Sequence, residues 1–156
     1  MVFEIEKKFL VKGDFKRFAT DSEKITQGYL CSVPERTVRI RTKGNKAFIT
    51  VKGPANESGT TRYEWEKEIA VEEAKKLLTL CEPGVIDKTR FHVPAGKHTY
   101  EVDEFYGENE GLIIAEVELN AEHENFEMPQ WLGDEVTGNP KYYNAMLMKH
   151  PYKNWK

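Results

Sequence analysis

Charged residues in this chain recur as pairs of the same sign, with one residue between the two members. Glu4 and Glu6 form the first pair and Arg39 and Arg41 form a later one, and the residue between each pair is isoleucine. Successive side chains of a β-strand point to opposite faces of its sheet, so residues two apart share a face. Each such segment is therefore predicted to be a strand with one charged face and one largely apolar face.

Fourteen charged side chains belong to these faces, and they fall into two groups by sign. The six cations are Lys8, Arg39, Arg41, Lys52, Lys88 and Arg90. The eight anions are Glu4, Glu6, Glu64, Glu66, Glu101, Asp103, Glu116 and Glu118. The ordinary alternative is a half-buried sheet with a solvated face, but such a face tends to intersperse charges of both signs. Same-sign pairs on so many segments instead predict that the charged faces converge on one shared space.

Short turn-like clusters separate these segments and predict how the strands connect. The clusters lie at residues 43–46, 53–60, 94–97 and 106–111, and the segments between them are rich in β-branched and aromatic residues. This spacing is typical of an antiparallel meander or barrel. The predicted fold is mainly β (α+β): an eight-stranded antiparallel closed β-barrel, or tunnel, with a charged lumen and short helices packed outside.

Four stretches are predicted to be helical, and these helices would pack over the apolar outer faces of the strands. The clearest is 71–81, whose apolar residues recur at helical spacing before a Glu-Pro-Gly sequence ends the helix. Shorter helices are expected at 14–20, near residue 121, and at 140–148, where a proline would occupy the first turn.

The composition limits the partners and compartments that the chain can have. Although 31% of the 156 residues are charged, 23 Lys and Arg nearly balance 26 Asp and Glu, whereas a general nucleic-acid binder would be basic overall. The acidic N-terminal residues do not fit a secretory signal peptide, and no apolar stretch approaches the ~20 residues of a membrane span. We expect a single cytoplasmic domain over residues 1–156, without membrane or general nucleic-acid partners, as a monomer or homodimer. Cys31 and Cys81 are expected to be buried free thiols, although one disulfide stays open.

A lumen that gathers both groups of charges suits one kind of chemistry. Six convergent cations fit a phosphate chain, because Arg matches phosphate oxygens with two hydrogen bonds and Lys acts as a point charge. The carboxylates would repel that chain unless a divalent cation lay between them, and Mg²⁺ or Mn²⁺ prefers oxygen ligands. The combination predicts metal-assisted phosphoryl transfer to water.

Short motifs in a fixed order then give a resemblance to a known family. Glu4-Ile5-Glu6-Lys7-Lys8 resembles the ExExK signature of the CYTH superfamily, the triphosphate tunnel metalloenzymes, and the length is similar to that of its short bacterial members. The other motifs follow in the family's order: QGYL at 27–30, RxR at 39–41, a lysine-bearing strand at 50–52, ExE at 64–66, KTRF at 88–91, ExD at 101–103, ExE at 116–118, and EVT followed by KY.N within 135–144. The resemblance covers nearly the whole chain.

The resemblance implies a tunnel open at both ends and hydrolysis of a triphosphate with Mg²⁺ or Mn²⁺. The implied catalytic residues are Glu4, Glu6, Lys8, Arg39 and Arg41, and the implied phosphate-binding residues are Lys8, Arg39, Arg41, Lys52, Lys88 and Arg90. The implied metal ligands are Glu4, Glu6, Glu116 and Glu118, with Asp103 as a further candidate. Glu64 and Glu66 would support a metal or a water, or would pair with arginines of the lumen.

The function expected from this resemblance is a metal-dependent triphosphate phosphohydrolase, with inorganic tripolyphosphate as the substrate and nucleoside triphosphates as further candidates. The same superfamily also includes adenylate cyclases and thiamine triphosphatases, which would use the same tunnel. A module that binds polyphosphate without turnover is the alternative from another class, and it would need the cations but not the carboxylates. The metal preference and the general base stay open.

Four residues near the motifs keep a second interpretation. Lys7 lies in the signature but on the outward face, which favours a surface lysine. His92 either lines a tunnel mouth or acts as a base, since an imidazole titrates near neutral pH. Glu68 is expected at a solvated strand end, and Lys141 lies either at a helix end or at a tunnel mouth.

Overall fold

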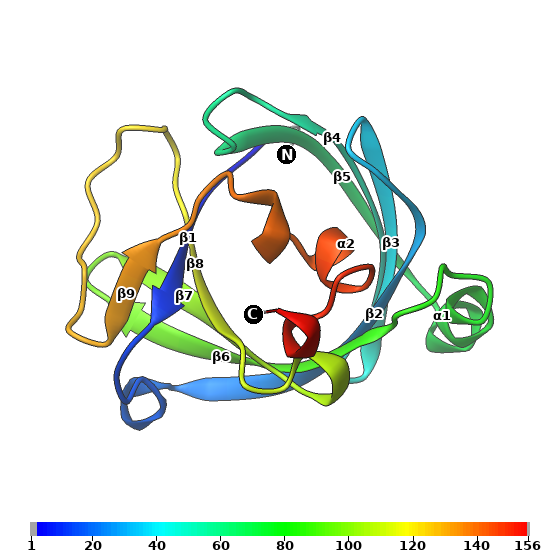
Figure 1. Ribbon diagram of the computed structural model, residues 1–156, viewed down its shortest axis with the longest axis horizontal. Helices are drawn as coiled ribbons and strands as arrows, with labels where there is room; N and C mark the ends of the chain where they lie inside the picture. The colour runs from blue at the N-terminus through cyan, green and yellow to red at the C-terminus, as the bar shows by residue number, and fades with distance from the viewer. Residues whose placement is uncertain (1–2, 156) are drawn as a thin grey trace.

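The computed structural model describes residues 3–155, and most of them belong to one strongly curved sheet (Figure 1). Its strands are β1 (Phe3–Val11), β2 (Asp21–Val33), β3 (Arg36–Lys43), β4 (Lys46–Ala55), β5 (Thr61–Ile69), β6 (Ile86–Ala95), β7 (His98–Phe105), β8 (Ile113–Glu118) and β9 (Leu132–Glu135). The α-helices are α1 (Val71–Leu78) and α2 (Asn144–Leu147). Single 3₁₀ turns lie at η1 (Lys16–Phe18), η2 (Gly107–Asn109), η3 (Pro140–Tyr142) and η4 (Tyr152–Asn154).

The first eight strands close into an antiparallel barrel, as predicted. The order around the sheet is β5-β4-β3-β2-β6-β7-β8-β1, and β1 then pairs with β5 to close the ring. The closing pair is short, running from Phe3 opposite Tyr63 to Ile5 opposite Thr61. Beyond it the same edge of β1 pairs with β9, an additional strand outside the ring.

The apolar core forms a layer around the barrel, because the strands turn their apolar faces outward. The segment between β8 and β9 runs over the outer faces of β1, β7 and β8, where Phe9, Tyr100 and Val117 are buried with Trp131 (Figure 1). Helix α1 covers the outer faces of β3 and β4, with Ala74 packed near Ile40. Because helix α1 and the β8–β9 segment pack on the apolar outer faces, the charged faces point inward, as predicted.

The predicted helices are longer than the observed ones. The helix at 71–81 ends at Leu78, the stretch at 14–20 contains only the turn η1, and the stretch at 140–148 divides into η3 and α2. The helix expected near residue 121 is wrong, because Glu124 accepts a hydrogen bond from the Asn120 backbone and a bend replaces the helix there. Cys31 and Cys81 are free thiols as expected, though half-buried. Within residues 3–155, the helices fall short of the length and apolarity that crossing a membrane requires.

The C-terminal segment corrects the prediction that the helices pack outside. Helix α1 does so, but α2 lies across one end of the barrel, within the ring of strands (Figure 1). At this end the inward residues change from charged to apolar, and Ile86, Phe105 and Ile114 pack against Leu147 and Met148. An apolar lumen wall needs an apolar cover, and α2 supplies it.

Candidate active site

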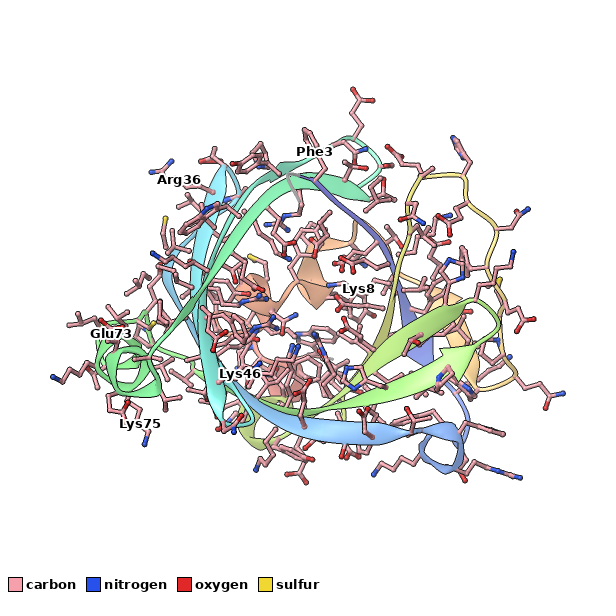
Figure 2. All side chains as sticks on the ribbon, turned by 180° about the vertical axis from the view of Figure 1, so that it is seen from behind. Phe3, Lys8, Arg36, Lys46, Glu73 and Lys75 are labelled. Atoms are coloured by element: carbon pink, nitrogen blue, oxygen red, sulfur yellow. The ribbon has the colours of Figure 1, made fainter. Side chains whose placement is uncertain are left out.

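The inward charged faces enclose a cavity of about 500 Å³ inside the barrel. All fourteen charged residues of the predicted faces line it except Asp103, which lies just behind two of them. In Figure 2 the Lys8 side chain points into the barrel from β1, whereas Phe3 on the opposite face lies at the outside. The lining also includes Pro34 and Pro54 beside the end where α2 lies.

Three carboxylates gather on one side of the cavity, and we call this group the acidic side. Glu4 from β1, Glu64 from β5 and Glu118 from β8 each place an oxygen within 4.8 Å of the others. The three meet because β1 pairs with β5 along one edge and with β8 along the other. Lys52 reaches across from β4, with its Nζ 2.9 Å from Glu4 Oε1 and 3.7 Å from Glu64 Oε2.

The carboxylates of the acidic side repel one another. Burial raises the pKa of Glu64, and the charge of Glu4 raises it further. Burial and then Glu4 raise the pKa of Glu118 in the same way. Glu6 lies next to this group on β1, where burial and the charges of Glu116 and Glu4 raise its pKa well above the usual range. Negative charge is therefore in excess here, which favours a bound cation.

Asp103 lies on the other side of the cavity and is fully engaged by two cations. Arg90 donates to both of its oxygens, at 2.8 and 3.0 Å, and the Lys88 Nζ lies 2.7 Å from Asp103 Oδ2. Burial opposes ionisation, but Arg90 and Lys88 outweigh it and hold the pKa of Asp103 below its usual range. Burial also lowers the pKa of Lys88 to about 8, even though Asp103 favours the ammonium form.

Glu116 is likewise held by cations. Its carboxylate lies 3.1 Å from Lys8 Nζ and 3.5 Å from Arg90 Nη2. Burial opposes ionisation, but Lys8 and Arg90 prevail and lower the pKa of Glu116 to about 2. Glu116 and Asp103 thus neutralise neighbouring cations, while the acidic side gathers Glu4, Glu64 and Glu118.

Two arginines of β3 share a single carboxylate. The Nη2 atoms of Arg39 and Arg41 lie 3.5 and 3.4 Å from the same oxygen of Glu66, which also accepts a 2.6 Å hydrogen bond from Thr50. Burial lowers the pKa of Arg41 to about 10, and the charges of Arg39 and Arg90 add to the effect. The buried Nε atoms of Arg39 and Arg41 have no hydrogen-bond partner within residues 3–155. Positive charge is in excess here, and we call Arg39, Arg41, Lys88 and Arg90 the basic side.

Comparisons with known proteins identify the family. The CYTH domain model matches residues 3–151. This chain belongs to the CYTH domain family. It is 47% identical over 154 residues to a protein of Acetivibrio thermocellus named inorganic triphosphatase, covering 98% of this chain and 97% of that one. It is 34% identical over 149 residues to the inorganic triphosphatase of Nitrosomonas europaea, covering 92% and 95%.

Solved structures of the family share the fold. The crystal structure of an inorganic triphosphatase superposes with a TM-score of 0.65 at 32% sequence identity, covering 95% of each chain. The CYTH resemblance expected from the motifs is thus confirmed, and so is the closed barrel.

The cavity also contains residues that the sequence patterns did not select. Arg62 lines it from β5, where it shares strand parity with Glu64, and Lys43 lines it from β3, where it shares parity with Arg41. Extending the parity by one step along each strand would have found both. Tyr143 and Asn144 line it from the C-terminal segment, where no strand pattern applies, although Asn144 belongs to the KY.N motif.

The four residues with a second interpretation, Lys7, Glu68, His92 and Lys141, lie outside the cavity lining. The Lys7 Nζ lies over the aromatic ring of Phe126, outside the barrel. The Lys141 Nζ lies 4.3 Å from the centroid of the Trp155 ring. His92 Nδ1 lies 2.7 Å from Asp21, at the end of the barrel away from α2. Glu68 is exposed at the end of β5, as expected.

Proposed function

We propose that this protein is a metal-dependent inorganic triphosphatase that hydrolyses tripolyphosphate inside the barrel. The observation that carries the proposal is the division of one cavity into an acidic side and a basic side. A phosphate chain needs cationic partners, and a divalent cation that accompanies it needs carboxylates. Relatives named inorganic triphosphatase that match almost end to end support the same substrate.

The phosphate chain would be bound by cations that converge from five strands. We assign this role to Lys8, Arg39, Arg41, Lys52, Arg62, Lys88 and Arg90. The unpartnered Nε atoms of Arg39, Arg41 and Arg62 supply donors that nothing in residues 3–155 satisfies. Phosphate oxygens would satisfy them, and the fixed guanidinium groups would offset charge that develops as the terminal phosphoanhydride bond breaks.

The acidic side fits a divalent cation. Glu4, Glu64 and Glu118 offer three oxygens close together, and their mutual repulsion would be relieved by a bound charge. Mg²⁺ or Mn²⁺ suits an all-oxygen site that is completed by water and phosphate. When bound, such a cation polarises phosphoryl oxygens and helps to orient the attacking water.

The remaining carboxylates would act through their neighbours. Glu116 and Asp103 would hold Lys8, Lys88 and Arg90 in place, because ion pairs already occupy their oxygens. Glu6 lies beside Glu4 along β1, and the charges of both Glu4 and Glu116 raise its pKa. We therefore include Glu6 as a further candidate metal ligand. Glu66 would fix Arg39 and Arg41.

Phosphate release from tripolyphosphate, ATP and thiamine triphosphate, each with Mg²⁺, Mn²⁺ or Ca²⁺, tests the proposal. We expect tripolyphosphate to be hydrolysed with the highest kcat/KM, and only with a divalent cation present. Binding without turnover would indicate a polyphosphate-binding module instead. Cyclic AMP and pyrophosphate as the main products of ATP would contradict a hydrolase.

Two adjacent lysines provide a matched pair of variants. Lys8→Met removes a cation from the cavity, whereas Lys7→Met removes one from the outer face of the same strand. We expect Lys8→Met to lower kcat/KM by about a hundredfold, the loss typical of a removed charge-stabilising donor, and Lys7→Met to leave it unchanged. Equal effects of the two variants on kcat/KM would contradict the proposal that tripolyphosphate is hydrolysed in the cavity.

A further inference from the structure

Asn144 at the start of α2 brings the C-terminal segment into contact with the basic side. Its side-chain Oδ1 accepts two hydrogen bonds, one of 2.9 Å from Lys88 Nζ and one of 3.0 Å from Gln27 Nε2. The two donors come from β6 and β2, and Asn144 itself lines the cavity. A residue outside the barrel strands thus touches a cation of the proposed phosphate site.

Lys88 fixes the orientation of this network. An ammonium group only donates, so the Asn144 atom facing it must be the carbonyl oxygen. That oxygen can accept a hydrogen bond only from the amide nitrogen of Gln27, which leaves Gln27 Oε1 buried without a partner in the described part of the chain. The Lys88 ammonium group therefore determines the orientation of the side-chain amides of both Asn144 and Gln27.

The same contacts define the direction of the Lys88 ammonium group. It has three N–H donors, and Asp103 Oδ2 at 2.7 Å and Asn144 Oδ1 at 2.9 Å take two of them. Lys88 is only 1% exposed, yet it lines the cavity, so the third donor is left for a group bound there. Asp103 fixes the ammonium group from β7 and Asn144 fixes it from α2.

The network is costly for stability alone. Gln27 is completely buried, and its unpartnered carbonyl loses the hydrogen bonds that it makes to water in the unfolded chain. An apolar side chain of similar size would avoid that cost, so the retained amide indicates another role. Its only hydrogen-bond partner among the described side chains is Asn144.

We propose that Asn144 is a positioning residue that orients Lys88 toward the phosphate chain. The seating of the C-terminal segment is then part of the substrate site, since Ala145, Leu147 and Met148 anchor α2 in the apolar end of the lumen. The inference rests on the proposed function for the identity of the anion. Beyond that function, the inference states that the C-terminal segment, which lies outside the barrel strands, controls the contact between Lys88 and the phosphate chain.

A double-mutant cycle between Asn144 and Lys88 tests this coupling. In the full chain, Asn144→Ala should raise KM for tripolyphosphate by about tenfold, the ratio for one lost hydrogen bond to a charged group, and change kcat much less. In a Lys88→Met background the same change should have no further effect. Lys88→Gln provides a second background if the methionine variant does not fold.

Two further variants separate positioning from structural support. Asn144→Gln keeps a neutral amide oxygen that can accept from Lys88 and should recover part of the KM lost in Asn144→Ala. Gln27→Met removes the unpartnered carbonyl and one donor to Asn144. We expect its melting temperature to be equal or higher and its KM to be higher, whereas a purely structural network would lose stability.

The outcomes decide the inference separately from the proposed function. If the wild type does not hydrolyse tripolyphosphate, the proposed function fails, and the same cycle is then measured as tripolyphosphate Kd by calorimetry. Coupling between Asn144 and Lys88 in either measurement supports the inference. It is overturned if Asn144→Ala leaves KM and Kd unchanged, if its effect persists in full without Lys88, or if the wild type does not bind tripolyphosphate.

Discussion

The acidic side and the basic side of the cavity differ in how well their charges are matched. On the acidic side Lys52 contacts two of the three carboxylates, Glu4 and Glu64, and the pKa values of Glu64 and Glu118 are raised. On the basic side Asp103 and Glu116 each contact two cations, and the pKa of each carboxyl is lowered. The difference teaches that the inward carboxylates of one barrel serve two purposes. Some hold cations of the protein in place, and others leave negative charge for a cation from solution.

Among these predictions, Asp103→Asn should have the largest effect on stability. Asp103→Asn removes the charge that neutralises Lys88 and Arg90, both of which are almost completely buried. Breaking a buried ion pair costs about 3–5 kcal/mol, so we expect a loss of that order in the free energy of unfolding. Urea denaturation measures it. An unchanged midpoint would show that the basic side does not need this carboxylate.

Removal of an arginine from the basic side should have the largest effect on activity. Arg41→Met takes away one of the two guanidinium groups that share Glu66, and we expect kcat/KM for tripolyphosphate to fall by about a hundredfold. Stability should change little, because burial and neighbouring cations already disfavour this charge. Arg36→Met, at the exposed start of the same strand, is the matched control and should retain full activity.

Neutralising Glu118 should not destabilise the protein, in contrast to neutralising Asp103. Glu118→Gln relieves repulsion on the acidic side, so without metal the melting temperature should stay the same or rise slightly, because solvent screens this exposed carboxylate. The added stabilisation by Mg²⁺ should disappear. Glu68→Gln, an exposed glutamate on β5, should change neither quantity. A lower melting temperature of the metal-free Glu118→Gln variant would place this carboxylate among the structural ion pairs.

The pH dependence should show the smallest effect and also separates the two sides. The raised pKa values of Glu64 and Glu118 mean that the native state holds protons which the unfolded chain has already lost. Their contribution to stability therefore falls as pH rises from the unfolded value near ~4.3 through the raised native values. Mg²⁺ should restore this loss, so its effect on the melting temperature should grow with pH across that window. The lowered pKa values of Asp103 and Glu116 act oppositely, and their contribution is lost as pH falls below ~4 toward the native values. A Mg²⁺ effect independent of pH would contradict the assignment of the acidic side.

Strand parity in the sequence predicted the barrel and nearly all of its charged lining. The pattern works because side chains in a closed sheet point either into the barrel or out of it. A face of same-sign charged pairs offers no apolar surface on which an outer layer could pack, so it is the face that points inward. It missed Lys43 because that residue was assigned to a turn, and it missed Arg62 because the charged pattern of its strand was started at Glu64. The parity rule itself holds at both positions.

The partners of individual charges could not be predicted from the sequence. Asp103 pairs with Arg90 because β7 and β6 align them directly opposite each other, and this register is set by the turn at residues 96–97. Glu64 joins Glu4 and Glu118 because β5 closes the ring against β1, a contact between distant parts of the chain. The position of α2 depends on the apolar end of the lumen, and this appears only when inward residues of three strands are brought together.

Mn²⁺ binding to purified variants, followed by the electron paramagnetic resonance signal of the free ion, tests most directly whether the two sides have different tasks. The account predicts that Arg41→Met binds Mn²⁺ as the wild type does, whereas Glu118→Gln loses the site. Equal Mn²⁺ binding by Glu118→Gln and the wild type, or loss of the site in Arg41→Met alone, would contradict the division of the cavity.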